Sequence, residues 1–348
     1  MGNYEDFMPD SSSGGFMKLL RFNVLVLIAL FSCFAGIASG RHVMPKGKNG
    51  GPLIVEIAVF VIDVDDIDGA NQNFTANVFY MCSWHDPNIA ERFDEVDVLP
   101  VMKLWTPKIQ VVNQQKIWPT MPETVEVYPD GKVIYRQRVW GQFSMPFNLK
   151  DFPFDEQDFS VQFVTIGRNR GDLRFKQSEE LPSGLAKEFS QADWKILDWE
   201  AKSQRYSPIK GIDNEGFILK FWAKRKTGYY IMKIIIPLIL IVMMSWAVFW
   251  IDPTDSGTQV GVAVTSMLTL IAYRFATDAL LPKVSYFTRL DYFILGSTIL
   301  IFTGLIEVLV TTKLAKMEKV ELARIVDKVA RVAMPLLFAA FTLKAFVF

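Results

Sequence analysis

Residues 258–281 read TQVGVAVTSMLTLIAYRFATDALL, and Pro282 and Lys283 follow directly. The stretch is apolar enough to enter a membrane, yet small and hydroxylated residues recur along it in steps of three and four, the spacing of one helix face. That face carries Thr258, Gly261, Thr265, Leu268, Ala272, Phe275 and Ala279. Hydroxyls at one end can replace an ion's hydration water, and bulky apolar residues further along can close a narrow water path. The pattern is typical of a pore-lining helix, although a helix packing small residues against a neighbour would also produce it.

Three more apolar stretches, residues 229–251, 286–312 and 325–348, are each near the roughly 20 residues that a helix needs to cross hydrocarbon. Of all residues 51% are hydrophobic, yet 21% are charged, which indicates a water-exposed part joined to a membrane part. The formal net charge is zero and gives no support to a nucleic-acid partner.

The N-terminus predicts export. Lys18 and Arg21 precede an apolar stretch, residues 22–34, and small residues at 38–40 offer a cleavage site, so residues 1–40 are expected to be an extension and a signal peptide. Cys82 is then the single mature cysteine, so no intramolecular disulfide is expected. Basic residues between the third and fourth stretches predict a cytoplasmic connection, and thereby an exported segment 41–226 and a membrane segment 227–348.

The exported segment has the pattern of an all-β sandwich. Strands are predicted at residues 54–63, 159–163 and 217–223, and a hairpin at 124–138 turns at Pro129, Asp130 and Gly131. Helix is expected at most at 185–191. Many short strands with turns between them are typical of a sandwich, here joined to the first membrane helix by a short basic linker.

An enzyme is not indicated. His42 and His85 are the two histidines, and no nucleophile–base pair, metal-ligand set or phosphate cradle accompanies them, so neither catalysis nor a cofactor is expected. The acids Asp63, Asp65, Asp66 and Asp68 form a cluster that we interpret as a solvated turn, with a calcium site as the minor alternative.

Residues 147–157 (FNLKDFPFDEQ) form a loop with an aromatic-Pro-Phe-Asp core, and residues 84–86 (WHD) and 104–109 (LWTPKI) contain a Trp-x-Asp and a Trp-x-Pro segment. Ile236-Pro237, Ser245-Trp246 and Leu281-Pro282 follow in or at the end of the apolar stretches. This ordered set resembles the signature loop, the strand segments and the helix motifs of the pentameric ligand-gated ion channels, the superfamily of the Cys-loop receptors. The resemblance implies a homopentamer around a central pore, which geometry also requires if one helix per chain lines it.

Two departures favour the prokaryotic branch. Phe159 and Met145 stand where eukaryotic members have the cysteines that flank the loop, and the predicted connection, residues 313–324, is short. A third departure concerns the ligand: the aromatic box of amine-binding members corresponds to Phe79, Val112, Ile166 and Tyr206, of which two are not aromatic. An amine agonist is therefore not favoured, and a different small molecule or protons are the alternatives.

Ion selectivity is expected at Asp252 and Asp255, because the linker that holds them has no base and five copies would concentrate negative charge. Either acid could also cap the following helix. By resemblance, coupling between sandwich and helices would involve Arg225 with Asp66, Asp68 and Asp155, while Pro153 and Phe154 press on the linker after Pro282. The alternative for Arg225 is a place among lipid headgroups.

These observations predict a cation channel in a bacterial inner membrane, with a periplasmic sandwich and a gate opened by a small ligand or by protons. Crowded carboxylates near the joint, including Glu156, make protons a candidate stimulus because neighbouring charges alter proton affinity. The rival hypothesis is a membrane-anchored periplasmic sensor whose helices only anchor and oligomerise.

Overall fold

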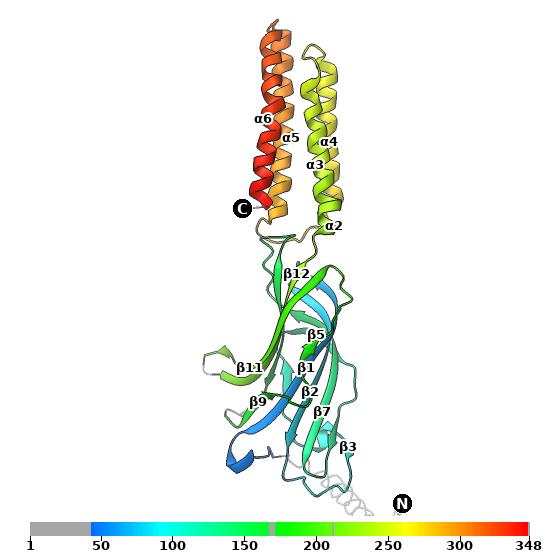
Figure 1. The fold of residues 1–348 in the computed structure, drawn as a ribbon, viewed down its shortest axis with the longest axis vertical. Coiled ribbons are helices and arrows are strands. Elements are labelled where there is room, and N and C mark those ends of the chain that lie inside the picture. Colours follow the sequence, from blue (N-terminus) through cyan, green and yellow to red (C-terminus); the bar gives the residue numbers. More distant parts are fainter. Residues whose placement is uncertain (1–42, 167–170, 211, 347–348) are drawn as a thin grey trace, which may run out of the picture.

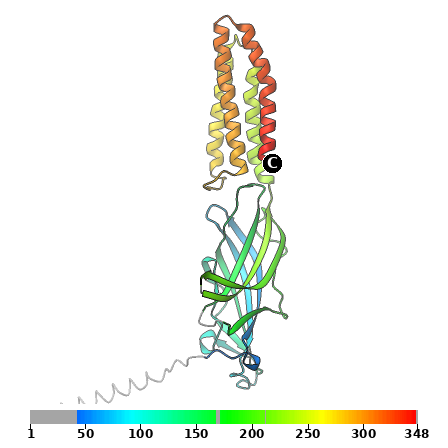
Figure 2. The ribbon, with the colours of Figure 1, turned by 90° about the vertical axis from the view of Figure 1, so that its left-hand side faces the viewer.

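A computed structural model describes residues 43–166, 171–210 and 212–346, and shows a β domain with a bundle of four long helices standing on it (Figures 1 and 2). The predicted signal peptide lies outside the described residues. The bundle joins the β domain at one end, and the connection between the last two helices lies at the opposite end. This arrangement confirms the predicted fold class of a sandwich followed by four apolar helices.

Two sheets form the β domain. The larger runs β10 (Gly184–Leu185), β1 (Leu53–Asp68), β2 (Asn73–His85), β7 (Lys132–Ser144), β6 (Thr124–Val127) and β3 (Asp97–Pro100), with β5 (Gln114–Pro119) on β7 and β9 (Leu173–Gln177) on β1. The smaller runs β11 (Trp194–Ile209), β12 (Ile212–Arg225), β8 (Glu156–Thr165) and β4 (Ile109–Val111). Two short 3-10 turns, η1 (Lys48–Gly50) and η2 (Val101–Lys103), complete the domain.

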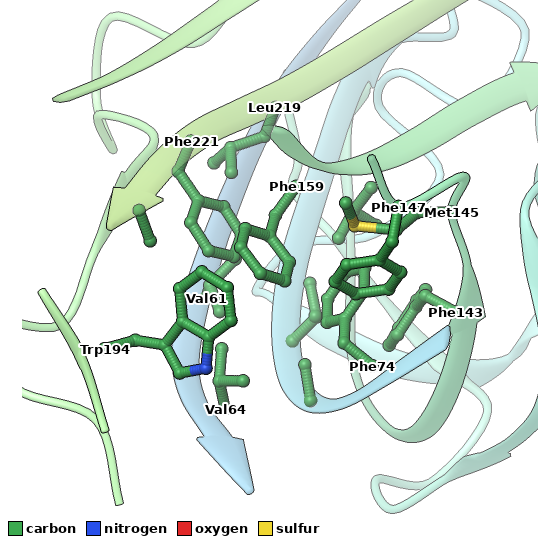
Figure 3. Packing of buried hydrophobic residues seen from close by; sticks show 14 of the residues in the cluster. Val61, Val64, Phe74, Phe143, Met145, Phe147, Phe159, Trp194, Leu219 and Phe221 are labelled. Atoms are coloured by element: carbon green, nitrogen blue, oxygen red, sulfur yellow. The ribbon is translucent and has the colours of Figure 1, made fainter. Parts of the chain in front are cut away.

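Aromatic side chains fill the space between the sheets (Figure 3). Phe159 of β8 stacks on Phe221 of β12 with ring centroids 4.9 Å apart, and Phe74 of β2 meets Phe159 edge-on at 5.3 Å. Alternation along β8 buries every second residue, which places Phe159 in this core. Phe159 and Met145 are both buried, so apolar packing occupies the two positions where eukaryotic relatives carry cysteines.

Two details of the β domain differ from the predictions, and a third agrees with them. Strand β1 continues to Asp68, so the acids from Asp63 onward lie on a strand with bulges and not in a turn, because β2 stays paired to them as far as Asn73. Residues 185–191 form no helix: after Gly184 and Leu185 pair with β1, the chain is irregular. The hairpin is confirmed, with Gly131 at φ +86° in its turn.

Four helical spans are long and apolar enough to cross a membrane. The first comprises α2 (Gly228–Tyr230), the π-turn η3 (Ile231–Ile235), α3 (Ile236–Trp246) and η4 (Ala247–Trp250). The others are α4 (Ser256–Asp278), α5 (Arg289–Lys316) and α6 (Val320–Phe346). Helices α5 and α6 pack closely where Gly296 meets the ring of Phe341, since a Cβ at Gly296 would lie 2.0 Å from that ring.

The connection between α5 and α6 is shorter than predicted: it is residues 317–319, not 313–324. The prediction ended each span where charges begin. Lys313, Lys316, Glu321 and Arg324 instead continue the helices beyond the apolar stretch, because long charged side chains suit an exposed helix end.

Candidate functional site

Helix α4 exposes the whole face that its sequence pattern singled out. All seven residues from Thr258 to Ala279 on that face are exposed in the single chain, with Leu268 at 60% and Phe275 at 80%. The opposite face is buried against the other helices through Gln259, Ala263, Ser266, Leu270 and Thr277. The candidate pore residues therefore point away from their own bundle.

The other helices expose a different chemistry. Helix α5 presents large apolar side chains at helical spacing, namely Leu295, Ile299, Phe302, Ile306 and Leu309. Helix α6 does the same with Ile325, Val329, Val332, Leu336 and Leu343. Such stripes suit contact with lipid chains, whereas the Thr, Gly and Ala of α4 do not. The composition of its exposed face thus sets α4 apart within the bundle.

Hydroxyl groups on α4 are bonded within the helix. The Thr265 hydroxyl donates to the carbonyl of Gly261 at 2.8 Å, and the Thr269 hydroxyl donates to that of Thr265 at 2.8 Å. Each hydroxyl oxygen keeps lone pairs that can still accept from water or face a cation. A row of partial negative charges therefore follows the first turns of the exposed face.

The linker before α4 holds the two acids that the sequence proposes for selectivity, and both are exposed. Asp255 is the N-cap of α4 and accepts from the amide of Thr258 at 3.3 Å, as the alternative interpretation expected. Asp252 accepts from the amide and hydroxyl of Thr254 at 2.9 and 2.7 Å, and it pairs with Arg324 of α6 at 3.0 Å.

The Thr254 hydrogen bonds and then Arg324 lower the pKa of Asp252 to about 2. The linker was expected to carry no opposing base, but the fold brings Arg324 to it from α6 and offsets one of its two acids. Arg324 was missed because it is distant from the linker in sequence, and only the folding of the α5–α6 hairpin brings it beside Asp252.

A buried ion pair lies where the β domain meets the helices. The Arg225 guanidinium donates to both carboxylate oxygens of Asp155 at 2.7 and 3.1 Å, with side chains only 10% and 1% exposed. The same guanidinium lies 4.3 Å from the Trp194 ring centroid and 5.0 Å from that of Phe152. This environment places Arg225 inside the protein and away from a headgroup position, and aromatic faces add cation–π attraction to the pair.

Asp66 and Asp68 were expected to share Arg225, and within the described chain that expectation is wrong, because neither forms an ion pair with it. Asp68 instead accepts from the backbone and side chain of Asn71 at 2.9 and 2.7 Å. Burial raises the pKa of Asp68, but the hydrogen bonds from Asn71 outweigh this and lower it. Both acids do line a cleft of about 330 Å³ beside Arg225 that also reaches Pro282.

The loop between β7 and β8 docks on the outer ends of the helices. The hydroxyl oxygen of Tyr286 accepts a hydrogen bond from the amide of Leu149 in this loop at 2.8 Å. The backbone amides of Arg289 and Leu290 donate to the carbonyls of Lys150 and Phe152 at 2.9 and 3.2 Å. These groups begin α5, whose Thr288–Asp291 capping box was a sequence signal that could have located this contact.

Pro153 and Phe154 were expected to press on the linker Leu281–Tyr286, but the aromatic partner of Phe154 is instead at the far end of the chain. Pro153 is buried, and the Phe154 ring lies 5.5 Å from that of Phe346 at the end of α6. The loop thereby contacts α5 and α6 together. Phe346 was missed because the predicted topology returns the end of α6 to the side of the β domain but does not say which residue it meets there.

The four candidate ligand-binding residues divide between the two sheets. Val112 and Ile166 lie at the ends of β4 and β8, and Tyr206 lies on β11 of the same smaller sheet. Phe79 lies on β2 of the larger sheet, next to Phe60 and Arg138. All four are at least partly exposed, so a site containing them would combine surfaces of two different sheets.

No metal centre accompanies these sites among the described residues, where no group of three or more His, Cys, Asp and Glu side chains is placed to hold an ion. His85 lies 2.7 Å from the carbonyl of Asp130 in the β6–β7 hairpin. Cys82 is buried, which raises the pKa of its thiol and makes it a poor nucleophile.

Two family profiles match the chain. The neurotransmitter-gated ion-channel ligand binding domain matches residues 39–226, and the neurotransmitter-gated ion-channel transmembrane region matches residues 234–321. The first match alone spans more than half of the chain. The chain belongs to the neurotransmitter-gated ion-channel family, the pentameric ligand-gated channels of the Cys-loop superfamily, and is a multi-pass membrane protein with an extracellular ligand-binding domain. It is an ion channel and not an enzyme.

Proposed function

We propose that this ligand-gated channel is cation-selective and that five identical copies surround a pore lined by α4. The observation that carries the proposal is the exposed face of α4, with hydroxyl and small residues at its inner end and Leu268 and Phe275 further out. Five such faces make a ring that is polar near the linker and apolar beyond it, which can both attract and exclude ions.

Cation preference rests on Asp255 more than on Asp252. Asp252 is offset by Arg324, whereas Asp255 has no ion pair among the described residues and caps the helix one turn before Thr258. Five uncompensated carboxylates at the inner mouth would raise the local concentration of monovalent cations and repel anions.

Gating passes through the joint in this proposal. Arg225 is continuous with the first membrane span, and Asp155 belongs to the loop that contacts α5 and α6. A movement of the smaller sheet is therefore passed to three helices by a pair that is costly to break. The stimulus is a small molecule bound between Phe79 of one copy and Val112, Ile166 and Tyr206 of the next, or protons acting on the acids near the joint.

We further propose a bacterial inner membrane as the location, with residues 1–40 removed on export and residues 41–226 in the periplasm. The three-residue connection between α5 and α6 supports the bacterial location, because a short connection at this place favours the prokaryotic branch of the superfamily.

Recordings from the purified protein in planar bilayers test the stimulus. Current evoked by pH alone supports protons, and current evoked at constant pH by one member of a small-molecule panel supports the interface site. Thr265→Leu serves as the pore control, because a larger apolar side chain there should reduce conductance whichever stimulus opens the channel. A protein that conducts under none of these conditions would favour the rival hypothesis of a membrane-anchored sensor.

A further inference from the structure

Three polar side chains from three helices lie in the half of the bundle that faces away from the β domain, two of them buried and the third, Glu307, half-buried. They are Gln259 of α4, Glu307 of α5 and Asp327 of α6, and the last two lie side by side. Gln259 and Asp327 are 0% exposed, and both carboxylate oxygens of Glu307 are shielded from solvent. At about 1.5 Å per residue, they lie roughly 5, 14 and 10 Å inside the nearest helix ends.

The oxygens of this group outnumber the hydrogen-bond donors near them. Within the described residues, all four carboxylate oxygens of Glu307 and Asp327 lack a partner of good geometry, and so does Oε1 of Gln259. The Gln259 amide nitrogen donates one N–H to the carbonyl of Ile251 at 3.0 Å, and its second N–H is a neutral donor near Asp327. Five acceptors with at most one neutral donor are rare in a buried place, because the others would lose their bonds to water without replacement.

The surrounding charges do not neutralise the pair. Arg331, one turn after Asp327, donates its Nε to the carbonyl of Phe249 at 2.8 Å and lies over the Trp250 ring. Arg324 is paired with Asp252 of the linker. At this end of the bundle, α4 and the linker before it add only the acids Asp252 and Asp255. Lys313 of α5 and Lys328 of α6 are exposed, and residues 234–251 of the first span carry no charged side chain. No described Lys, Arg or His side chain forms an ion pair with Glu307 or Asp327.

Two carboxylates in this position cannot both stay ionised. An unpaired charge in an apolar bundle is neutralised by taking up a proton, and of two adjoining carboxyls at least one is protonated at neutral pH. The proton also supplies the missing donor, because the O–H of one acid can bond to the other carboxylate or to Gln259 Oε1. We propose that Glu307 and Asp327 form a proton-binding site that holds at least one shared proton.

A proton fits this place better than a metal ion. Calcium takes six to eight oxygens, and the three side chains offer five at most, one of them an amide. A proton needs only two acceptors and no room. The site is therefore assigned to a proton, and a bound cation becomes an outcome that the experiment can detect.

The location gives this proton a mechanical role. An apolar cluster one turn away joins the first span and α4 to α5 and α6, through Val248, Phe249, Ala263, Val308, Ala330 and Met334. Loss of the proton would set two like charges against each other between α5 and α6 and draw in water. The support behind the inner end of α4 would then loosen. This consequence rests on the proposed pore, whereas the proton site itself does not.

Infrared spectroscopy of the purified full-length protein in lipid nanodiscs tests the site without any need for current. At neutral pH the wild type should show the carbonyl stretch of a protonated carboxylic acid, and Glu307→Gln and Asp327→Asn should each lose that intensity. Glu318→Gln removes an exposed acid of the α5–α6 connection and should keep it. A wild type without the band at neutral pH, or a band that survives both substitutions, overturns the proposal.

Thermal unfolding of the wild type gives a second measurement if a variant fails to assemble. Stability should fall as pH rises above the ordinary carboxyl pKa of about 4, and the fall should level off at the pH where the infrared band is lost. Stability that instead depends on added Ca²⁺ with both carboxyls ionised would assign the site to a cation and overturn the proton. In bilayers, Asp327→Asn should lose the alkaline part of any pH response, and a silent channel would count against the pore while leaving the infrared result intact.

Discussion

The proposed gate should be most sensitive to a substitution of Leu268. Its side chain and that of Phe275 are the bulky groups on the exposed face of α4, so a shut pore should be dry there. Leu268→Ser should wet this ring and produce leak current, or a shift in half-activation of roughly 10- to 150-fold, since burial of such a side chain is worth about 1.5–3 kcal/mol. Current recordings measure both.

Leu309→Ser provides the matched control, because Leu309 is 54% exposed on the apolar stripe of α5. It should leave gating close to wild type. Wild-type behaviour of Leu268→Ser, together with no effect of Thr265→Leu, would mean that this face does not line the pore.

The two linker acids should differ in their effect on selectivity. Asn caps a helix about as well as Asp, so Asp255→Asn removes the charge and retains the cap of α4. We expect Asp255→Asn to move the reversal potential towards that of the anion more than Asp252→Asn does, because Arg324 already offsets Asp252. Equal shifts, or none, would place the filter elsewhere, with Asp278 at the outer end of α4 as the next candidate.

The hydrogen bonds from Thr254, and after them the pair with Arg324, also predict a pH dependence through Asp252. The pKa of Asp252 is about 2 in the folded protein, below the unfolded value of about 3.9. A lowered pKa contributes stability above the unfolded value and loses it as pH falls towards 2. Unfolding measured at decreasing pH should therefore show a smaller acid loss in Asp252→Asn than in the wild type, and an identical loss would show that the pair contributes nothing.

At the scale of elements, the joint can be tested with a double-mutant cycle. Breaking a buried ion pair by removing one partner costs roughly 3–5 kcal/mol. Asp155→Asn and Arg225→Gln should each lower stability and weaken gating, and the double variant should lose less than the sum of the two. Additive losses in unfolding midpoint and half-activation would mean that the pair acts as two independent groups.

Elements were predicted well wherever the pattern is local. The β6–β7 hairpin follows from Pro129, Asp130 and Gly131, and α4 follows from its repeated small residues. Predictions failed where partners decide the outcome: β1 extends to Asp68 because β2 pairs with it, and α5 extends to Lys316 because charged residues continue a helix past the apolar region.

Side-chain partners could be predicted only in part. The pairing of Arg225 with Asp155 follows from a family resemblance, but Arg324 beside Asp252 and Phe346 beside Phe154 depend on how α6 folds back. Glu307 was detectable as an acid within an apolar span. Its partner was not, because twenty residues and a helical hairpin separate it from Asp327.

At the scale of the whole molecule, family and fold agree on a channel, and the assembly supplies what one chain lacks. One α4 face cannot enclose water, and the four candidate ligand residues lie on two different sheets, so the proposed ligand site combines surfaces of neighbouring copies. Mass measurement of the purified complex in detergent should therefore give five chains. A stable monomer that unfolds at the same midpoint as the assembled protein would contradict the proposed pentamer.

The reversal potential of the purified wild type in a salt gradient across a bilayer tests the central claim most directly. A pore lined by α4 with five Asp255 side chains at its mouth should give a reversal potential close to the equilibrium potential of the monovalent cation. A reversal potential at the anion's equilibrium value, from a protein shown to conduct, would contradict the account.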